Sequence, residues 1–378
     1  MKQKIKVLFL TNLPAPYKVE FFNRLGSMCD LTVLFEREIS SDRDCDWKTD
    51  EGCGFRVIFL NGIRVNNEDA LCFNVVKYLK KNSFDVIVIC GYTTPTSILA
   101  LNYCKIRRIK YVLSIDGARD KVERPIVKML KTFFIKGADS YLCTGQEPRR
   151  FLINHGANAK TIYIYPFTSL SECHVDKEVF SRSDKIALRK ELEIKEDKVI
   201  ISVGQYIYRK GFDVLLNALE PNRVDIGVYI IGGKEPTKEY QEIIEKRKLN
   251  NVHFISFQKK QELLKYYHAA DIFVLPTRED IWGLVINEAM ACGLPVITTT
   301  HCVAGIELIK PGENGFLVNS DSIEELACKI KILMESEDYR MRIANNNLKK
   351  ISEYTLEKMA EVHFEVFHHI QEANSNFK

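Results

Sequence analysis

The stretch DIFVLPTREDIWGLVINEAMACGLPVITT, residues 271–299, decides the fold class. It opens with an apolar run of strand length that ends at Pro276, and a polar loop follows. Gly283 precedes a helical segment, and Gly293 suits the end of that helix because glycine tolerates the left-handed conformation found there. Pro295 then starts a second apolar run. A strand, a helix and another strand in this order predict a parallel βαβ unit.

The same alternation continues on both sides of this stretch. Short apolar runs separated by helix-length segments are typical of a parallel sheet that is covered on both faces. In the first half we expect strands over 5–10, 31–36, 55–60, 85–90, 110–115 and 139–144, with helices over 17–28, 69–82, 94–107 and 124–136. In the second half we expect strands over 199–203, 226–231, 252–255, 272–275 and 295–299, with helices over 212–219, 238–248, 261–268, 284–292 and 356–372.

The alternation pauses between residues 166 and 184, where the sequence is polar and lacks an apolar period. We place a domain boundary there, because 378 residues are too many for one ordinary core. The expected fold class is α/β, with two Rossmann-like doubly wound parallel-sheet domains and a ligand-binding cleft between them. The domains are 1–170 and 171–353, and a last helix occupies 354–378.

The composition narrows the class of protein. No apolar run approaches the roughly 20 residues of a membrane-spanning helix, and the N-terminus lacks the features of a secretory signal. We therefore expect a cytoplasmic protein. The 11 cysteines and 8 histidines show no zinc-binding spacing, so we expect neither a metal site nor disulfides.

Positive charge is concentrated in residues 105–150, which hold 12 basic and 5 acidic residues. Within this region the helix expected over 124–136 has an apolar stripe, with its lysines mostly off the stripe. The stripe consists of Ile126, Leu130, Phe133 and Phe134. The pattern fits either a surface helix on an anionic membrane or a core-facing helix with solvated lysines. No aromatic–basic platform or helix-turn-helix accompanies the charge, so we expect no nucleic-acid partner.

Two acidic residues lie in the quoted stretch, Asp280 in the loop and Glu288 in the helix. Asp280 is expected at the carboxyl edge of the sheet, where α/β proteins bind ligands. Glu288 stands among apolar helix residues, and a buried carboxylate without a partner is costly. The paired hydroxyls of a ribose would satisfy it, and so would a salt bridge or a helix cap. The pattern leaves these alternatives open.

Two further loops offer groups that bind anions. VGQYIYRKGFD, residues 203–213, delivers Arg209 and Lys210 just before a helix. Cations beside a helix N-terminus suit a diphosphate, although exposed basic loops are common. THCVAGIEL, residues 300–308, places Gly305 at another helix start, where backbone N–H groups can bind an anion.

These three stretches, in this order, resemble the retaining glycosyltransferases of the GT-B fold, specifically glycosyltransferase family 4. The resemblance covers most of residues 199–319. In that family two acids separated by seven residues mark the donor site, and here they fall on Asp280 and Glu288, although the first is usually glutamate. The resemblance implies that Glu288 binds the ribose, Asp280 the hydroxyls of the transferred sugar, and Lys210 the phosphates.

The resemblance also implies further donor contacts. Gln205 stands where the family usually has an arginine, and Arg209 is the candidate to supply the missing charge. The segment 252–257 corresponds to the one whose backbone reads the base. The implied donor-binding residues are Gly204, Gln205, Arg209, Lys210, Phe257, Asp280, Gly283, Leu284, Glu288, Ala304, Gly305 and Ile306.

The N-terminal half matches the family less well. Many members carry a histidine after the strand expected over 110–115, and here that position holds Asp116. Asp116 either orients or deprotonates an acceptor hydroxyl, or is a turn residue before Gly117. By resemblance, the last helix packs back on the N-terminal domain, which binds the acceptor.

The resemblance implies a retaining, metal-independent hexosyltransferase without a cofactor. It would move a sugar from a nucleotide-diphosphate sugar, specifically a UDP-sugar, to a lipid-linked or polysaccharide acceptor at the cytoplasmic face of a membrane. The catalytic candidates are Asp280, Glu288, Lys210 and Asp116. Two alternatives remain: a nucleotide-sugar 2-epimerase on a related fold, and a catalytically inactive subunit that binds nucleotide sugar. The departures at Gln205, Asp116 and Asp280 suggest the inactive subunit.

Overall fold

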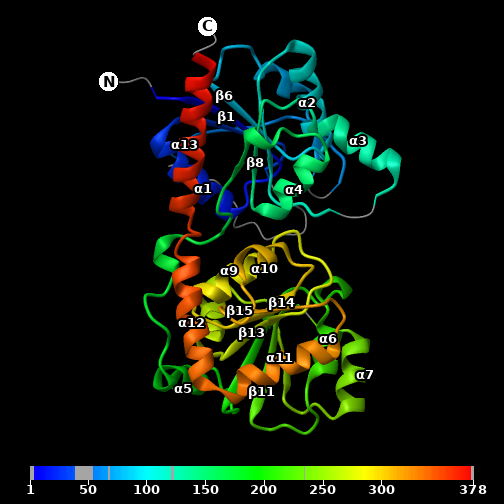
Figure 1. Cartoon of the computed structure of the whole chain (residues 1–378), viewed down its shortest axis with the longest axis vertical. Helices are drawn as coiled ribbons and strands as arrows, with labels where there is room; N and C mark the ends of the chain where they lie inside the picture. The colour runs from blue at the N-terminus through cyan, green and yellow to red at the C-terminus, as the bar shows by residue number, and fades with distance from the viewer. Residues whose placement is uncertain (1–3, 39–53, 67–68, 121–122, 234, 376–378) are drawn as a thin grey trace. The chain divides into compact units, whose positions relative to one another are not determined.

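The chain folds into two compact units, seen in a computed structural model (Figure 1). The structure describes residues 4–38, 54–66, 69–120, 123–233 and 235–375. Unit 1 combines Met1–Ser169 with Thr355–Lys378, and unit 2 is Leu170–Tyr354. No helix among the described residues is long and apolar enough to span a bilayer.

Unit 1 is built on a parallel sheet whose described strands have the order β3-β2-β1-β6-β7-β8-β9. The strands are β1 (Lys6–Thr11), β2 (Asp30–Phe35), β3 (Arg56–Phe59), β6 (Val86–Cys90), β7 (Val112–Ile115), β8 (Ser140–Cys143) and β9 (Ile162–Ile164). In the centre, Leu8 of β1 lies between Thr32 of β2 and Ile87 of β6. The strand order reverses beside β1, and in doubly wound sheets ligands bind at the carboxyl edge near such a reversal.

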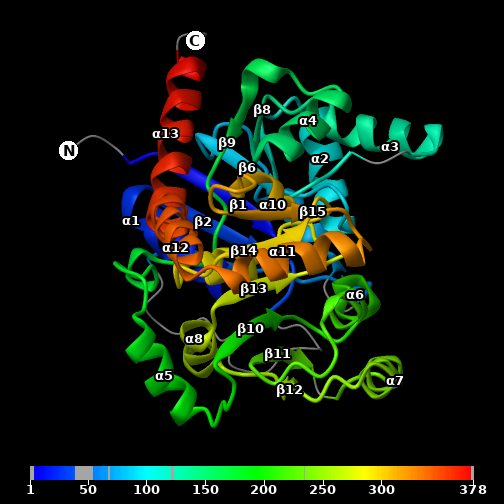
Figure 2. The same ribbon diagram turned by 60° about the horizontal axis from the view of Figure 1, so that its bottom comes forward.

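Helices flank this sheet, and the last of them comes from the far end of the chain. They are α1 (Pro16–Met28), α2 (Pro95–Arg107), α3 (Pro125–Ile135), α4 (Gln146–Asn154) and α13 (Leu356–Ser375). Three begin at a proline, whose fixed φ and missing N–H suit a first helical turn. Helix α13 packs along α1 (Figures 1 and 2), and its Phe367 ring lies 6.0 Å from that of Phe9 in β1. The C-terminal helix is therefore part of unit 1.

The helix expected over 69–82 is wrong. The chain there forms a two-stranded antiparallel pair, β4 (Ile63–Arg64) with β5 (Ala70–Leu71), followed by a 3₁₀ helix, η1 (Phe73–Lys77). The Thr96 hydroxyl donates to the Ala70 carbonyl (2.6 Å) and accepts from the Cys72 N–H (2.9 Å). These bonds to α2 hold the segment extended, and a 3₁₀ turn satisfies nearly the same apolar spacing as an α-helix.

Unit 2 repeats the design with a parallel sheet whose described strands have the order β12-β11-β10-β13-β14-β15 (Figure 2). The strands are β10 (Lys198–Val203), β11 (Ile226–Gly233), β12 (Val252–Ser256), β13 (Ile272–Leu275), β14 (Val296–Thr299) and β15 (Gly315–Val318). The order reverses between β10 and β13, where Ile200 pairs with Ile272. The expected fold class, two doubly wound parallel-sheet domains of the α/β type, is confirmed.

Helices α6 to α10 connect these strands, α5 precedes β10, and α11 and α12 follow β15. They are α5 (Arg182–Glu191), α6 (Phe212–Ala218), α7 (Lys238–Arg247), α8 (Lys260–Ala269), α9 (Leu284–Ala291), α10 (Val303–Leu308), α11 (Ile323–Glu335) and α12 (Glu337–Ile351), with a short 3₁₀ turn, η4 (Tyr208–Lys210). Helix α5 was not expected, although its capping box is visible in the sequence: the Ser181 hydroxyl accepts from the Asp184 N–H.

Candidate functional site

Three loops meet at the carboxyl edge of the unit 2 sheet. They follow β10, β13 and β14, which are neighbouring strands. The Thr277 hydroxyl donates to the Arg209 carbonyl at 2.9 Å. The Asp280 N–H donates to the His301 carbonyl (3.1 Å), and the Val303 N–H donates to the Asp280 carbonyl (3.2 Å). The three sequence stretches singled out above therefore form one connected surface.

An ion pair lies at the centre of these loops. The Lys210 Nζ is 2.6 Å from the Asp280 Oδ2, and the Arg209 Nη1 is 3.7 Å from the same oxygen. The Lys210 and Asp280 side chains are only 11% and 14% exposed, whereas Arg209 is 44% exposed. Limited exposure reduces screening by water, so Lys210 and Asp280 interact more strongly than a surface pair. Two cations thus converge on one carboxylate.

Two glycines allow this close approach of loops. Gly211 has φ +69°, and a Cβ there would lie 2.1 Å from the Pro276 carbonyl oxygen at the end of β13. Gly283 has φ +98°, and a Cβ there would lie 2.8 Å from the Cys302 sulfur. Any other residue would strain both turns. Gly211 thus allows the Lys210 loop to approach the end of β13, and Gly283 allows the loop that carries Asp280 to approach the loop after β14.

Helix α10 fits the predicted anion-binding role less directly. Ala304 and Gly305 are buried, and a Cβ on Gly305 would lie 2.5 Å from the Thr298 methyl carbon. The Ala304 N–H donates to the Trp282 carbonyl (2.9 Å), and the Ile306 N–H donates to the Cys302 carbonyl (3.1 Å). These donors already have acceptors within the protein. Contact between this loop and a donor phosphate stays a prediction.

Glu288 lies on α9 and has a tyrosine partner. The Tyr267 hydroxyl, from α8, donates to the Glu288 Oε2 at 3.1 Å. Burial raises the pKa of the Glu288 carboxyl, and the hydrogen bond from Tyr267 opposes that rise. Burial also raises the pKa of Tyr267 well above its ordinary value, so this hydroxyl remains a donor near neutral pH. A ribose would offer Glu288 hydroxyl donors of the same kind as the Tyr267 hydroxyl.

Three other predicted donor residues lie along the same edge of the unit. Phe257 follows β12 and is 72% exposed. Gln205 follows β10 and is exposed, and Leu284 is the first residue of α9 and half-buried. Between Gln205 and the 3₁₀ turn, Tyr206 is buried, with its hydroxyl 2.8 and 2.7 Å from the carbonyl oxygens of Ile230 and Ile255. Tyr206 thereby ties the loop after β10 to β11 and β12.

Arg278 is a site residue that the sequence did not single out. Its guanidinium donates to both carboxylate oxygens of Asp213 (2.8 and 2.5 Å) and to Asp321 (2.7 Å). The same guanidinium lies 3.8 Å from the centroid of the Tyr208 ring. These contacts fix the turn that carries Lys210. Asp213 is 65 positions away along the chain, so no local pattern could have revealed the pair.

In unit 1, Asp116 follows β7 and accepts a hydrogen bond from the buried Tyr165 hydroxyl at 3.0 Å. Burial, with the neighbouring Asp116 charge, raises the pKa of Tyr165 well above its ordinary value, so the hydroxyl stays a donor. Asp116 also lines a pocket with Thr11, Lys18 and His363. Asp116 thus lies at the carboxyl edge of the unit 1 sheet with a hydrogen-bond partner, and a role toward an acceptor stays a prediction.

Glu36 is a second carboxylate at the carboxyl edge of unit 1, and the sequence did not single it out. It is 2% exposed and follows β2. The Thr94 hydroxyl donates to its Oε1 at 2.6 Å, while its Oε2 has no hydrogen-bond partner among the described residues. Burial raises the pKa of the Glu36 carboxyl to about 7. This group is thus partly protonated near neutral pH.

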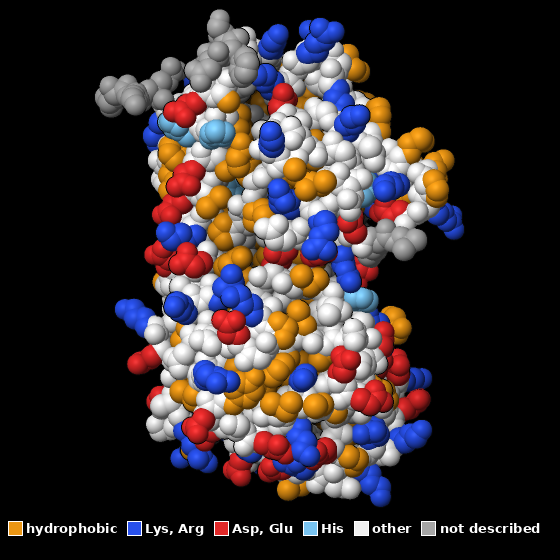
Figure 3. Space-filling view, viewed as in Figure 1, with side chains coloured by type: hydrophobic (Ala, Val, Ile, Leu, Met, Phe, Trp, Pro, Cys, Tyr) orange, Lys and Arg blue, Asp and Glu red, His pale blue; other side chains and the backbone are white. Residues whose placement is uncertain are grey.

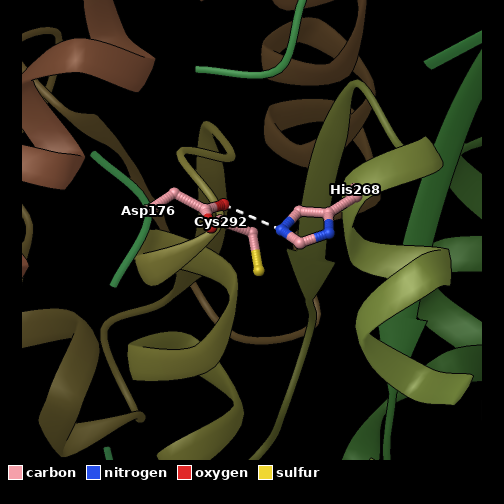
Figure 4. Close-up of side chains that lie close together, drawn as sticks. All are labelled: Asp176, His268 and Cys292. Atoms are coloured by element: carbon pink, nitrogen blue, oxygen red, sulfur yellow. Dashed lines mark hydrogen bonds and ion pairs between the residues drawn. The ribbon is translucent and has the colours of Figure 1, made fainter. Parts of the chain in front are cut away.

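One group in the described part of the chain has the residue types of a metal site. Asp176, His268 and Cys292 have ligand atoms within 4.8 Å of one another, and Figure 4 shows the carboxylate and imidazole pointing toward each other beside the thiol. The His268 Nε2 is 2.8 Å from the Asp176 Oδ2, and the ring stacks on Phe180. A metal would have to displace that hydrogen bond. Burial also raises the pKa of the Cys292 thiol well above its ordinary value, which disfavours the thiolate that metals bind.

Comparisons with known proteins identify the family model and the fold that this chain matches. Residues 184–350 match the family model described as glycosyl transferases group 1. An uncharacterized glycosyltransferase of Haemophilus influenzae is 29% identical over 171 residues, which cover 44% of this chain and 48% of that protein. The chain thus spans about half the length of the first curated relatives it matches.

Two further proteins are similar over more of their length. The Campylobacter jejuni protein named N,N'-diacetylbacillosaminyl-diphospho-undecaprenol alpha-1,3-N-acetylgalactosaminyltransferase is 20% identical over 75% of this chain and 76% of its own length. The crystal structure of Anabaena Alr3699/HepE in complex with UDP has a TM-score of 0.75 at 20% identity, covering 98% of this chain and all of that one. The chain therefore has the GT-B fold, and its residues 184–350 match the glycosyl transferases group 1 family model.

Proposed function

We propose that this protein is a retaining glycosyltransferase that transfers a sugar from a UDP-sugar to a lipid-linked or polysaccharide acceptor. The observation that carries the proposal is the half-buried Lys210–Asp280 pair, 2.6 Å long, where three loops of the family-matched region meet. A cation that is fixed by protein contacts can stabilise a leaving diphosphate without reorganising during the reaction.

Lys210 and Asp280 would exchange partners when the donor binds. The Lys210 ammonium would move its interaction from the Asp280 carboxylate to the diphosphate oxygens. Asp280 would then accept hydrogen bonds from hydroxyls of the sugar. Arg209, whose Nη1 donates to the Glu279 carbonyl at 2.8 Å, would add a second positive charge beside the diphosphate. With these protein cations in place, we propose that the reaction needs no metal and no cofactor.

Glu288 would hold the nucleotide end of the donor. Its carboxylate would accept hydrogen bonds from the two ribose hydroxyls, with the Tyr267 hydroxyl fixing its orientation. The choice of uridine rests on the HepE structure, which contains UDP. The choice of a lipid-linked acceptor rests on the Campylobacter relative, whose name specifies a diphospho-undecaprenol acceptor. Both choices are proposals for this chain.

Asp116 would act on the acceptor side. The hydrogen bond from Tyr165 keeps one carboxylate oxygen in place, and the other oxygen could orient an acceptor hydroxyl or take its proton. In a retaining reaction the acceptor would attack from the face that the diphosphate leaves. We assign no residue as a covalent nucleophile.

The test is to incubate the purified protein with UDP-, GDP- and dTDP-sugars in the presence of EDTA and to measure the nucleoside diphosphate released. We expect release from one UDP-sugar, which increases when a lipid-linked acceptor is added. NMR of the product should show the anomeric configuration of the donor. An altered UDP-sugar without release of UDP would instead indicate a 2-epimerase, and tight nucleotide binding without any turnover would indicate an inactive subunit.

A further inference from the structure

Helix α3 turns its apolar side away from the protein. It lies at the side of unit 1 in both ribbon views (Figures 1 and 2). Five large apolar side chains on it are exposed; besides Val127 (38%), four of them have the i, i+3, i+4 and i+7 spacing of one helix face. They are Ile126 (62% exposed), Met129 (62%), Leu130 (50%) and Phe133 (57%). In a helix that packs on a core, the apolar stripe is buried. The interpretation of α3 as a core-facing helix is therefore wrong.

The opposite side of α3 is firmly attached to unit 1. Ile135 is fully buried, and Phe134 packs on the core, so Phe134 does not belong to the exposed stripe and Met129 takes its place. The Lys105 ammonium, from α2, donates to the carbonyls of Phe133 (2.5 Å) and Phe134 (3.2 Å) at the end of α3. The exposed face is therefore a fixed feature of the folded unit.

Exposed basic side chains lie on the same helix, at its ends and on the neighbouring helix α2. Figure 3 shows hydrophobic side chains with Lys and Arg beside them over α3, at the right edge of the molecule. The exposed basic residues on α3, at its ends and at the end of α2 are Arg107, Arg108, Arg124, Lys128 and Lys136. Ile106, on α2 next to Lys105, is 79% exposed. The nearby acid Glu123 is paired with Lys131 and His155, so its charge is largely compensated. Val122, also in the basic stretch, lies outside the described residues.

We propose that this face of α3, the α3 patch, docks on the surface of an anionic lipid bilayer. The patch consists of Ile126, Met129, Leu130 and Phe133. These side chains would enter the boundary between headgroups and acyl chains, while the surrounding arginine and lysine side chains pair with lipid phosphates. Charge complementarity selects this partner, because a fixed apolar ridge edged by cations matches an apolar layer edged by anions. The docking does not depend on the proposed transferase activity.

The test is co-sedimentation of the full chain with vesicles of phosphatidylglycerol and phosphatidylcholine in equal parts, without nucleotide sugar. We expect the wild-type protein to bind, and Met129→Ser with Phe133→Ser to weaken binding about tenfold or more. Lys128→Glu with Lys136→Glu should also weaken binding and reduce its dependence on salt. The matched control is Ile186→Ser with Val224→Ser, which removes two exposed apolar side chains of unit 2 and should bind normally.

Three outcomes would overturn the proposal. The first is unchanged binding by the Met129/Phe133 variant, and the second is equal binding to vesicles of phosphatidylcholine alone. The third is a wild-type dimer that the same variant dissociates, with no vesicle binding by either protein. Release of nucleoside diphosphate from a soluble donor should be equal in all the variants, because none of them alters the loops around Lys210. Failure of docking and failure of the proposed reaction therefore give different results.

Discussion

The two sheets offer different chemistry at their carboxyl edges. In unit 2 the loops are held by charged contacts, namely Lys210 with Asp280 and Arg278 with Asp213. In unit 1 the carboxylates of Asp116 and Glu36 are held by hydroxyl groups. A charged ligand can replace a partner in an ion pair, whereas a carboxylate with a neutral partner suits a ligand that brings hydroxyls of its own. The difference supports an anionic donor on unit 2 and a hydroxyl-bearing acceptor on unit 1.

The largest effect is expected from Lys210→Ala, which removes the cation at the centre of the unit 2 site. Loss of a fixed group that stabilises developing charge typically costs about 100- to 1,000-fold in rate. We expect a loss of this size in kcat/KM, measured as release of nucleoside diphosphate under saturating acceptor. The Asp280 carboxylate would also lose its closest partner, 2.6 Å away.

The matched control for Lys210→Ala is Lys331→Ala, which removes a lysine that is 63% exposed on α11. This variant should retain wild-type activity and thermal stability. If Lys210→Ala kept wild-type kcat/KM while binding nucleotide normally, unit 2 would not use this cation in catalysis. The proposed contrast between the two edges would then fail.

The second prediction concerns stability. Two buried groups of unit 1 change the unfolding free energy in opposite directions as the pH changes. Burial lowers the pKa of His363 to about 4 from an ordinary value of 6.5, so its contribution to stability is lost as pH falls from 6.5 toward 4. Burial raises the pKa of Glu36 to about 7 from 4.5, so its contribution to stability is lost as the pH rises from 4.5 toward 7. Each shift corresponds to at most about 3 kcal/mol. The two trends largely cancel near pH 5 to 6.

Single substitutions should reveal the two trends separately. We expect Glu36→Gln to lose up to about 2 kcal/mol of unfolding free energy between pH 6.5 and 5, because the His363 effect is no longer offset. We expect His363→Gln to gain stability over the same interval. The measurement is urea denaturation followed by circular dichroism at each pH. If the unfolding free energies of both variants and the wild type changed in parallel with pH, the opposite pKa shifts of Glu36 and His363 would be contradicted.

The sequence predicted unit 2 better than unit 1 for a physical reason. The residues around Asp280 and Lys210 lie in loops between a strand and a helix, so short-range patterns of glycine, proline and apolar runs place them correctly. Tyr267 and Arg278 act through partners on other elements, and no local pattern reports such contacts. In the segment 69–82, hydrogen bonds to Thr96 override the helical spacing. For α3, periodicity identified an apolar stripe, but only tertiary structure shows which way it faces.

A smaller effect is expected from Glu288→Ala, which removes the carboxylate proposed to bind ribose. Loss of a charge-assisted hydrogen bond of this kind costs roughly 1.5–3 kcal/mol, so the Kd for UDP should rise about tenfold or more. Isothermal titration calorimetry with UDP measures it directly. Tyr267→Phe is the matched variant, because it removes the 3.1 Å hydrogen bond and keeps the carboxylate. We expect Tyr267→Phe to weaken UDP binding less than Glu288→Ala does. A larger rise in the Kd for Tyr267→Phe would assign the nucleotide contact to the tyrosine.

The smallest effect is expected where the chain departs from the family pattern, at Gln205. If Arg209 supplies the charge that the family places at this position, Arg209→Gln should weaken UDP binding a few-fold, since an exposed charge contributes only about 0.2–1 kcal/mol. Adding Gln205→Arg to that variant should restore binding, because it returns a cation to the end of β10. Gln205→Arg alone should change the Kd little. The opposite result would be an unchanged Kd for UDP in Arg209→Gln and a lower Kd in Gln205→Arg. Lys210 would then be the cation of the loop after β10 that binds UDP, and Arg209 would not contribute.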